Sequence, residues 1–160
     1  MSKMFWDVLI DCNRYRVFET ELSPKENLAL MDVLEKATDI RTAWRPLRLN
    51  LFEEEGKMRR MERKKPLANF MHGKVIPVVN TQARKIIEPL VKGQVEFLLC
   101  ETPVGPYYGL HVKYVDCLDT SRIEAKYFSD GRVMRVIKYA FHWERLEGIH
   151  IFRLPELGLS

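Results

Sequence analysis

Few residues in this sequence have the type and spacing to carry out chemistry. Asp116 and Asp119 bracket Cys117-Leu118 at the end of an apolar run, and paired carboxylates can act as acid and base or bind a divalent ion. With His111 and His142 they form the candidate site of a small enzyme, assembled from residues that are distant in the sequence. The competing interpretation, which we favour, is that Asp119 caps the turn at residues 120–121.

Signatures of metal binding and nucleophilic catalysis are missing from the sequence. The four histidines, at positions 72, 111, 142 and 150, do not have the i, i+4 spacing of a zinc-protease helix. The three cysteines form no CxxC pair, and Cys100 and Cys117 lie in alternating runs, which favours buried, inert thiols. No GxSxG elbow and no phosphate-binding glycine loop is present. We therefore predict no catalytic residue, no metal, no cofactor and no enzymatic activity.

One segment, 57–65 with the sequence KMRRMERKK, is a dense basic cluster. It could contact phosphates, so a nucleic-acid-binding module is another alternative, but it contains no aromatic residue that could stack on bases. A solvated loop is the favoured interpretation, and its methionines suit an adaptable protein contact. We predict that the irregular segment 41–65 contributes to a partner-binding surface, with these candidate residues: Trp44, Glu53, Glu54, Glu55, Met58 and Met61.

The N-terminal half of the sequence predicts strands and two helices. Alternation at residues 4–10 predicts a strand, with 15–19 as its hairpin partner. Ser23-Pro24 with Glu26 is typical of a capped helix start, and an apolar stripe continues to about Thr38. A short strand is predicted at 47–52, and another at 75–79, whose internal Pro77 indicates an edge or a bulge. Asn80 is predicted to cap a second helix that Pro89 kinks or ends.

The C-terminal half is predicted to be mainly β. Alternating runs predict strands at 94–100, 107–118, 122–128 and 133–139, with a last short strand at 150–154. Asp130-Gly131 between two of these runs indicates a hairpin turn. Strands that follow one another with short turns pair antiparallel, so we predict an α+β fold with a mainly antiparallel sheet and two or three helices.

The composition bounds the class of protein. A chain of 160 residues with 46% hydrophobic and 30% charged residues suits one folded domain, and we predict a single domain over 1–160. The net charge of +4 is mild, which makes nucleic acid an unlikely partner. No stretch has the length of a membrane span or of a signal peptide, and the odd number of cysteines fits a reducing compartment. We expect a cytoplasmic protein without membrane contact.

Several short motifs follow one another in the region of about 64–155. They are VIPVVN at 75–80, VEFL at 95–98, YY at 107–108, VDCLD at 115–119 and GIHIFRLP at 148–155. Their order resembles that of the myxobacterial-type immunity-protein domain of bacterial polymorphic toxin systems. Asn80 stands where the family usually has serine, a change that preserves helix capping. The resemblance implies a protein that binds and neutralises a cognate toxin without catalysis, and the missing catalytic motifs agree with that expectation.

Overall fold

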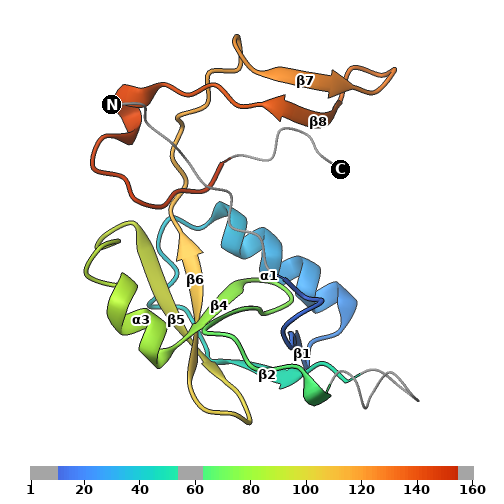
Figure 1. Ribbon diagram of the computed structural model, residues 1–160, viewed down its shortest axis with the longest axis vertical. Helices are drawn as coiled ribbons and strands as arrows, with labels where there is room; N and C mark the ends of the chain where they lie inside the picture. The colour runs from blue at the N-terminus through green and yellow to red at the C-terminus, as the bar shows by residue number, and fades with distance from the viewer. Residues whose placement is uncertain (1–10, 54–62, 155–160) are drawn as a thin grey trace. The chain divides into compact units, whose positions relative to one another are not determined.

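A computed structural model describes residues 11–53 and 63–154, and their elements are shown in Figure 1. Contacts group the chain into two compact units, the first formed by 1–89 and 96–111 and the second by 90–95 and 112–160. The predicted α+β class is confirmed, while the prediction of one domain over 1–160 stays a prediction. Two α-helices and eight strands are described, in the order β1 Phe18–Thr20, α1 Pro24–Lys36, β2 Leu47–Leu51, β3 Phe70–His72, β4 Pro77–Asn80, α3 Thr81–Ile87, β5 Val95–Glu101, β6 Tyr107–Val112, β7 Glu124–Tyr127 and β8 Val133–Lys138, followed by a 3₁₀ turn at Trp143–Leu146.

A six-stranded sheet organises the first unit, in the order β1-β2-β5-β6-β4-β3. β1 pairs with β2 antiparallel, and β4 pairs antiparallel with both β3 and β6. The β2–β5 pair is parallel, with Leu47 opposite Cys100 and Arg48 opposite Glu101. Parallel neighbours need a long connection, and here the chain between β2 and β5 builds β3, β4 and α3 before it returns. The sheet is therefore mainly antiparallel, as predicted, with one parallel pair that local periodicity does not reveal.

Helix α1 begins at the predicted capping box. The backbone N–H of Glu26 donates to Ser23 Oγ at 3.3 Å, and Glu26 Oε2 accepts from the backbone N–H of Ser23 at 2.8 Å. The helix ends at Lys36, two residues before the predicted end. Leu34 faces the core from its last turn, and Ile40 follows it there from the next loop. α1 is thus fixed at its start by its own sequence and at its end by packing.

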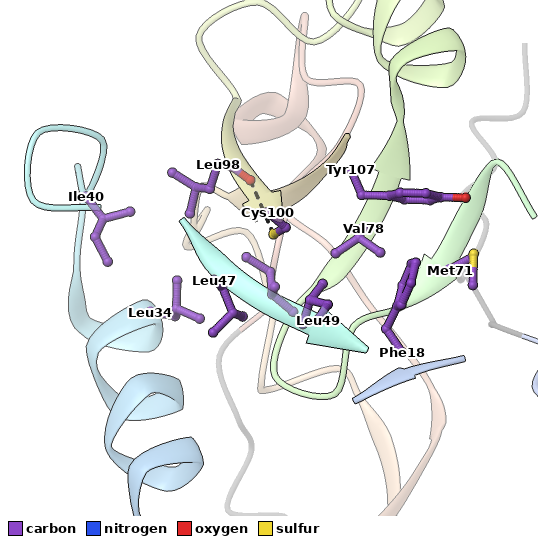
Figure 2. Packing of buried hydrophobic residues seen from close by; sticks show 11 residues of the cluster. Phe18, Leu34, Ile40, Leu47, Leu49, Met71, Val78, Leu98, Cys100 and Tyr107 are labelled. Atoms are coloured by element: carbon purple, nitrogen blue, oxygen red, sulfur yellow. Dashed lines mark hydrogen bonds between the residues drawn. The ribbon is translucent and has the colours of Figure 1, made fainter. Parts of the chain in front are cut away.

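The core of the first unit lies between α1 and the sheet (Figure 2). The ring of Phe18 from β1 meets the ring of Tyr107 from β6 edge-on, with centroids 4.9 Å apart. Leu49, Val78 and Leu98 contribute from three further strands. Because these side chains are far apart in the sequence, from Phe18 to Tyr107, their burial holds the strands of the sheet together.

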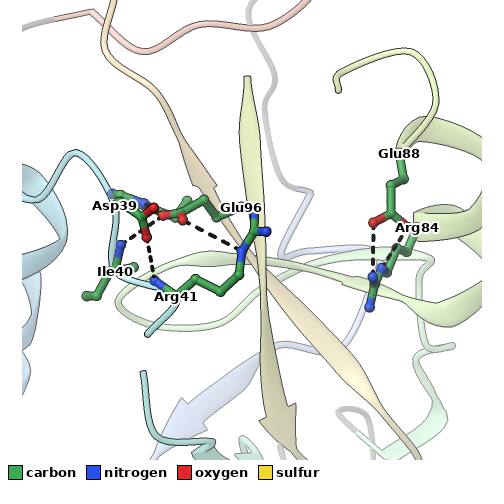
Figure 3. A network of polar contacts seen from close by, with 7 residues as sticks. Asp39, Ile40, Arg41, Arg84, Glu88 and Glu96 are labelled. Atoms are coloured by element: carbon green, nitrogen blue, oxygen red, sulfur yellow. Dashed lines mark hydrogen bonds and ion pairs between the residues drawn. The ribbon is translucent and has the colours of Figure 1, made fainter. Parts of the chain in front are cut away.

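Helix α3 begins where predicted, because Asn80 Oδ1 accepts from the backbone N–H of Ala83 at 2.9 Å. It ends at Ile87, before Pro89. Arg84 makes two hydrogen bonds with the carboxylate of Glu88, each 3.0 Å long, as Figure 3 shows. Its guanidinium also lies 4.3 Å from the ring centroid of Tyr108 on β6, so this one side chain fastens the short helix to the sheet.

Pro77 was predicted to mark an edge or a bulge, and of these two the edge is wrong. β4 lies between β6 and β3, inside the sheet. Proline is nevertheless tolerated there because Pro77 is the first residue of β4, and the pairing with β6 begins only at Val78.

The second unit is built around the β7–β8 hairpin. Its turn contains the predicted Asp130-Gly131, with Gly131 at φ 86°, a left-handed conformation that glycine adopts without strain. The predicted strand over 107–118 ends at Val112, and the predicted strand over 150–154 is wrong. There the described chain forms a single bridge, between Tyr114 and Arg153. The predicted N-terminal strand over 4–10 lies outside the described residues, and residues 15–19 overlap β1, which pairs with β2.

Aromatic side chains pack together in the second unit. The ring of Phe141 stacks with Tyr139 at 6.0 Å and meets Phe152 edge-on at 5.9 Å. Gln94 ties the loop beyond the 3₁₀ turn, because its side-chain oxygen accepts from the backbone N–H of His150 at 2.8 Å and its amide donates to Gly148 O at 3.0 Å. The side chain of Gln94 thus binds the backbone at residues 148–150, while backbone pairing in the segment 150–154 is limited to Arg153.

Candidate functional site

The first unit encloses a buried pair of ionisable side chains, Glu96 on β5 and His111 on β6. Both are 3% exposed. His111 Nδ1 lies 2.8 Å from Glu96 Oε2, and His111 Nε2 lies 2.9 Å from the carbonyl oxygen of Leu34 near the end of α1. Glu96 Oε2 also accepts from the backbone N–H of Ile40 at 3.1 Å, and the Arg41 guanidinium lies 3.8 Å from Oε1 (Figure 3).

His111 uses both ring nitrogens to connect α1 with β5. A carbonyl oxygen only accepts, so Nε2 donates to Leu34, while Nδ1 contacts the carboxylate of Glu96. Burial raises the pKa of Glu96, but the hydrogen bonds from His111 and from the Ile40 N–H outweigh it and hold that pKa below its usual value.

This pair is an anchor for α1 on the sheet. Each ring nitrogen of His111 already faces an acceptor, and the carboxylate of Glu96 already has several donors. The arrangement joins the last turn of α1 and the following loop to β5 and β6. His111 was a candidate residue of the predicted enzyme site, but its partner Glu96 was not. The sequence did contain a signal for this partner. Alternate residues of a strand face the same side of a sheet, so Glu96 faces the core together with Leu98 and Cys100.

The other members of the predicted enzyme site belong to the second unit. Asp116 Oδ2 accepts from Arg145 at 2.8 Å. Asp119 Oδ1 accepts from the hydroxyl and the backbone N–H of Ser121 at 2.6 and 3.2 Å, so the predicted turn cap is confirmed. The Ser121 hydrogen bond, more than the charge of His142, lowers the pKa of Asp119. The enzyme alternative itself stays a prediction.

The two cysteines in alternating runs are buried. Burial raises the pKa of the Cys100 thiol to about 11 and also raises the pKa of Cys117. A thiol is nucleophilic only as the thiolate, so these positions suit packing, as the sequence indicated. Cys12, by contrast, is exposed.

The predicted partner-binding residues fall in two groups. Trp44 is half-buried, packs against the core, and donates its indole N–H to the carbonyl oxygen of Leu99 at 2.8 Å. Glu53 receives two hydrogen bonds from Arg63, at 3.2 and 3.1 Å. The remaining candidates, Glu54, Glu55, Met58 and Met61, lie outside the described residues, as does most of the basic segment 57–65. A role for any of them in partner binding stays a prediction.

The first unit also has an open surface hollow of about 310 Å³. It lies beside the start of α3, and its described lining contains no charged residue: Leu67, Ala68, Asn80, Thr81, Gln82, Val104, Gly105, Pro106 and Tyr107. This described lining contains no carboxylate, histidine or cysteine.

A different kind of site lies on the β7–β8 hairpin, where large apolar side chains are exposed. Ile137 and Tyr127 are 58% and 54% exposed, and Met134, Tyr139 and Phe128 also face solvent. These two strands form a sheet with no third strand among the described residues. A two-stranded ribbon is only marginally stable alone, and large apolar side chains gathered on a surface mark a contact site. The Asp130-Gly131 turn predicted this hairpin, but the exposure of its apolar side chains was not predicted.

No group of three or more histidine, cysteine or acidic side chains is placed to hold a metal ion within the described ranges. Among the same residues, no helix is both long and apolar enough to cross a bilayer. Comparison of the chain with protein-family models, with curated proteins and with solved structures finds no match.

Proposed function

We propose that this protein acts by binding another protein, and that the β7–β8 hairpin is part of the contact surface. The observation that carries the proposal is the exposure of Tyr127, Met134 and Ile137 on a ribbon of two strands. Binding to a partner would remove this apolar surface from water. Aromatic residues and methionine are also the types enriched at protein interfaces.

The motif resemblance set out above supplies the partner class. It supports a cytoplasmic immunity protein that neutralises a bacterial toxin by forming a complex with it. Inhibition of this kind needs shape and a few well-packed anchors, with no catalytic group. Nanomolar to picomolar inhibition requires a binding free energy of about 12–16 kcal/mol, which an interface of roughly 800 Å² per partner can supply when it is well packed.

Co-expression with the toxin encoded beside this gene tests the proposal. We expect wild-type protein to restore growth and to co-elute with the toxin in size-exclusion chromatography. The double variant Met134→Ser/Ile137→Ser should bind at least tenfold more weakly, because it removes exposed apolar anchors. Leu28→Ser/Ile86→Ser is the matched control, since both side chains are large, apolar and exposed on helices of the first unit. Absence of growth rescue together with absence of a complex would refute the proposed function.

A further inference from the structure

Two like charges face each other on the β7–β8 hairpin. The register places Lys126 of β7 directly opposite Arg135 of β8. Like charges at directly opposed positions destabilise a strand pair. Nearby cations have carboxylate partners, since Arg132 contacts Asp130 at 2.8 Å and Lys138 contacts Glu124 at 3.2 Å. Within the described part of the chain, neither Lys126 nor Arg135 has an ion pair, so this repulsion is left uncompensated.

Two irregularities in the register add apolar groups beside these cations. Ala125 pairs with Val136 while Glu124 pairs with Lys138, so Ile137 has no residue opposite it. In the same way, Lys126 pairs with Arg135 and Tyr127 with Val133, which leaves Met134 unpaired. Bulges of this kind redirect side chains. Met134 and Ile137 are 47% and 58% exposed. Each directly precedes a basic residue of β8, Arg135 or Lys138.

The charge of the hairpin is strongly one-sided. Residues 122–139 hold five basic and two acidic side chains, a net charge of +3 in a chain whose total is +4. The basic residues are Arg122, Lys126, Arg132, Arg135 and Lys138, and the acidic ones are Glu124 and Asp130. The element that exposes these apolar side chains is therefore also clearly basic.

From this juxtaposition we infer that the hairpin docks an acidic protein surface. Carboxylates of the partner bind between Lys126 and Arg135 and relieve their repulsion, while apolar groups of the partner cover Met134 and Ile137. The inference rests on the proposed function and names the chemistry of its partner. A protein fits better than a nucleic acid, because the exposed aliphatic side chains of Met134 and Ile137 beside the cations can be covered by apolar side chains of a partner protein, whereas phosphates would contact the cations alone.

Synthetic peptides test this chemistry with the full-length protein. The probe is a fluorescein-labelled peptide of twelve residues that alternates glutamate and leucine, and its counterpart alternates lysine and leucine. Fluorescence anisotropy should show binding of the glutamate peptide that weakens as salt rises, and at least tenfold weaker binding of the lysine peptide. A 20-base-pair DNA duplex is measured in parallel.

Charge variants locate the binding on the hairpin. Lys126→Glu/Arg135→Glu keeps a like-charge pair and so keeps the thermal stability, but it should weaken binding of the glutamate peptide about tenfold or more. The control Lys25→Glu/Lys85→Glu makes the same change in net charge on exposed helix positions of the first unit, and it should change binding less than twofold. Lys126→Glu alone converts the repulsion into an attraction to Arg135, so it should raise the melting temperature while it weakens binding.

Each other outcome overturns the inference. Equal affinity of the two peptides, or an unchanged affinity of Lys126→Glu/Arg135→Glu, excludes acidic docking at this pair. Tighter binding of the DNA duplex that depends on Lys126 and Arg135 assigns the face to nucleic acid. A dimer in sedimentation equilibrium that Met134→Ser/Ile137→Ser dissociates assigns it to a second copy of this chain.

The two proposals can fail separately. Peptide binding through Lys126 and Arg135 without toxin neutralisation leaves acidic docking intact and removes the toxin as partner. A toxin complex whose affinity is unaffected by Lys126→Glu/Arg135→Glu leaves the proposed function intact and removes this face from it.

Discussion

Removal of the Glu96 carboxylate should be among the most damaging single substitutions in the first unit. In Glu96→Leu, the buried Ile40 N–H and His111 Nδ1 both lose the oxygen that they contact at 3.1 and 2.8 Å. An unsatisfied buried polar group costs about 1–3 kcal/mol, and loss of one member of a buried ion pair costs about 3–5 kcal/mol. We expect the free energy of unfolding to fall by about 3–5 kcal/mol.

Glu96→Gln is the matched control because it keeps the shape of the side chain. Its amide oxygen can still accept from Ile40, but the uncharged amide is a weaker partner than a carboxylate for His111 Nδ1. One of the two contacts is thus preserved, and the expected loss is about 1–2 kcal/mol. Urea unfolding followed by circular dichroism at pH 7 measures both variants. A loss below 1 kcal/mol for Glu96→Leu, or equal losses for the two variants, would refute this reasoning.

The lowered pKa of Glu96 adds a pH dependence to the same experiment. Its folded pKa lies below the usual 4.5, so the ionised carboxylate contributes its full stabilisation above pH 4.5. That contribution is lost as the pH falls from 4.5 through the lower, folded value. The difference in stability between wild type and Glu96→Leu should therefore shrink below pH 4.5, and a difference that grows there would contradict the assignment.

Further predictions address the cap, the thiols and a tight turn. Ser23→Ala removes the hydroxyl of the capping box and should lower the free energy of unfolding by about 1 kcal/mol in urea titration. Cys12 should react with a thiol reagent in the native protein, whereas Cys100, with its pKa near 11, should react only in denaturant. Gly73→Ala would place a Cβ 2.4 Å from the carbonyl oxygen of Ile76, so it should lower the melting temperature more than Ser23→Ala does.

Local signals predicted the helix starts and the hairpin turn because their physics is contained in a few neighbouring residues. Ser23 with Glu26, and Asn80 before α3, satisfy free N–H groups of their own helices. Gly131 supplies the conformation that its turn requires. None of these depends on the rest of the chain, so each could be predicted with no knowledge of the fold.

Long-range pairing decided the features that the sequence did not predict. Alternation predicts a strand at Pro77 but does not predict which strands lie beside it. The position of β4 inside the sheet is set by its pairing with β3 and β6. Residues 150–154 alternate, yet the backbone N–H of His150 donates to the side-chain oxygen of Gln94 and not to a neighbouring strand. The apolar surface of the β7–β8 hairpin was not predicted for the same reason. Ile137 is exposed because no other described segment packs over it, and local alternation carries no information about that.

The parallel pairing of β2 with β5 has a consequence for synthesis of the chain. Leu47 and Arg48 meet their partners Cys100 and Glu101 only after about fifty more residues have been made. At a translation rate of about 5–20 residues per second, this takes roughly 3–10 seconds. During that interval β2 has β1 along one side and an unsatisfied edge along the other, which is where a nascent chain is most open to wrong pairing or to capture by a chaperone.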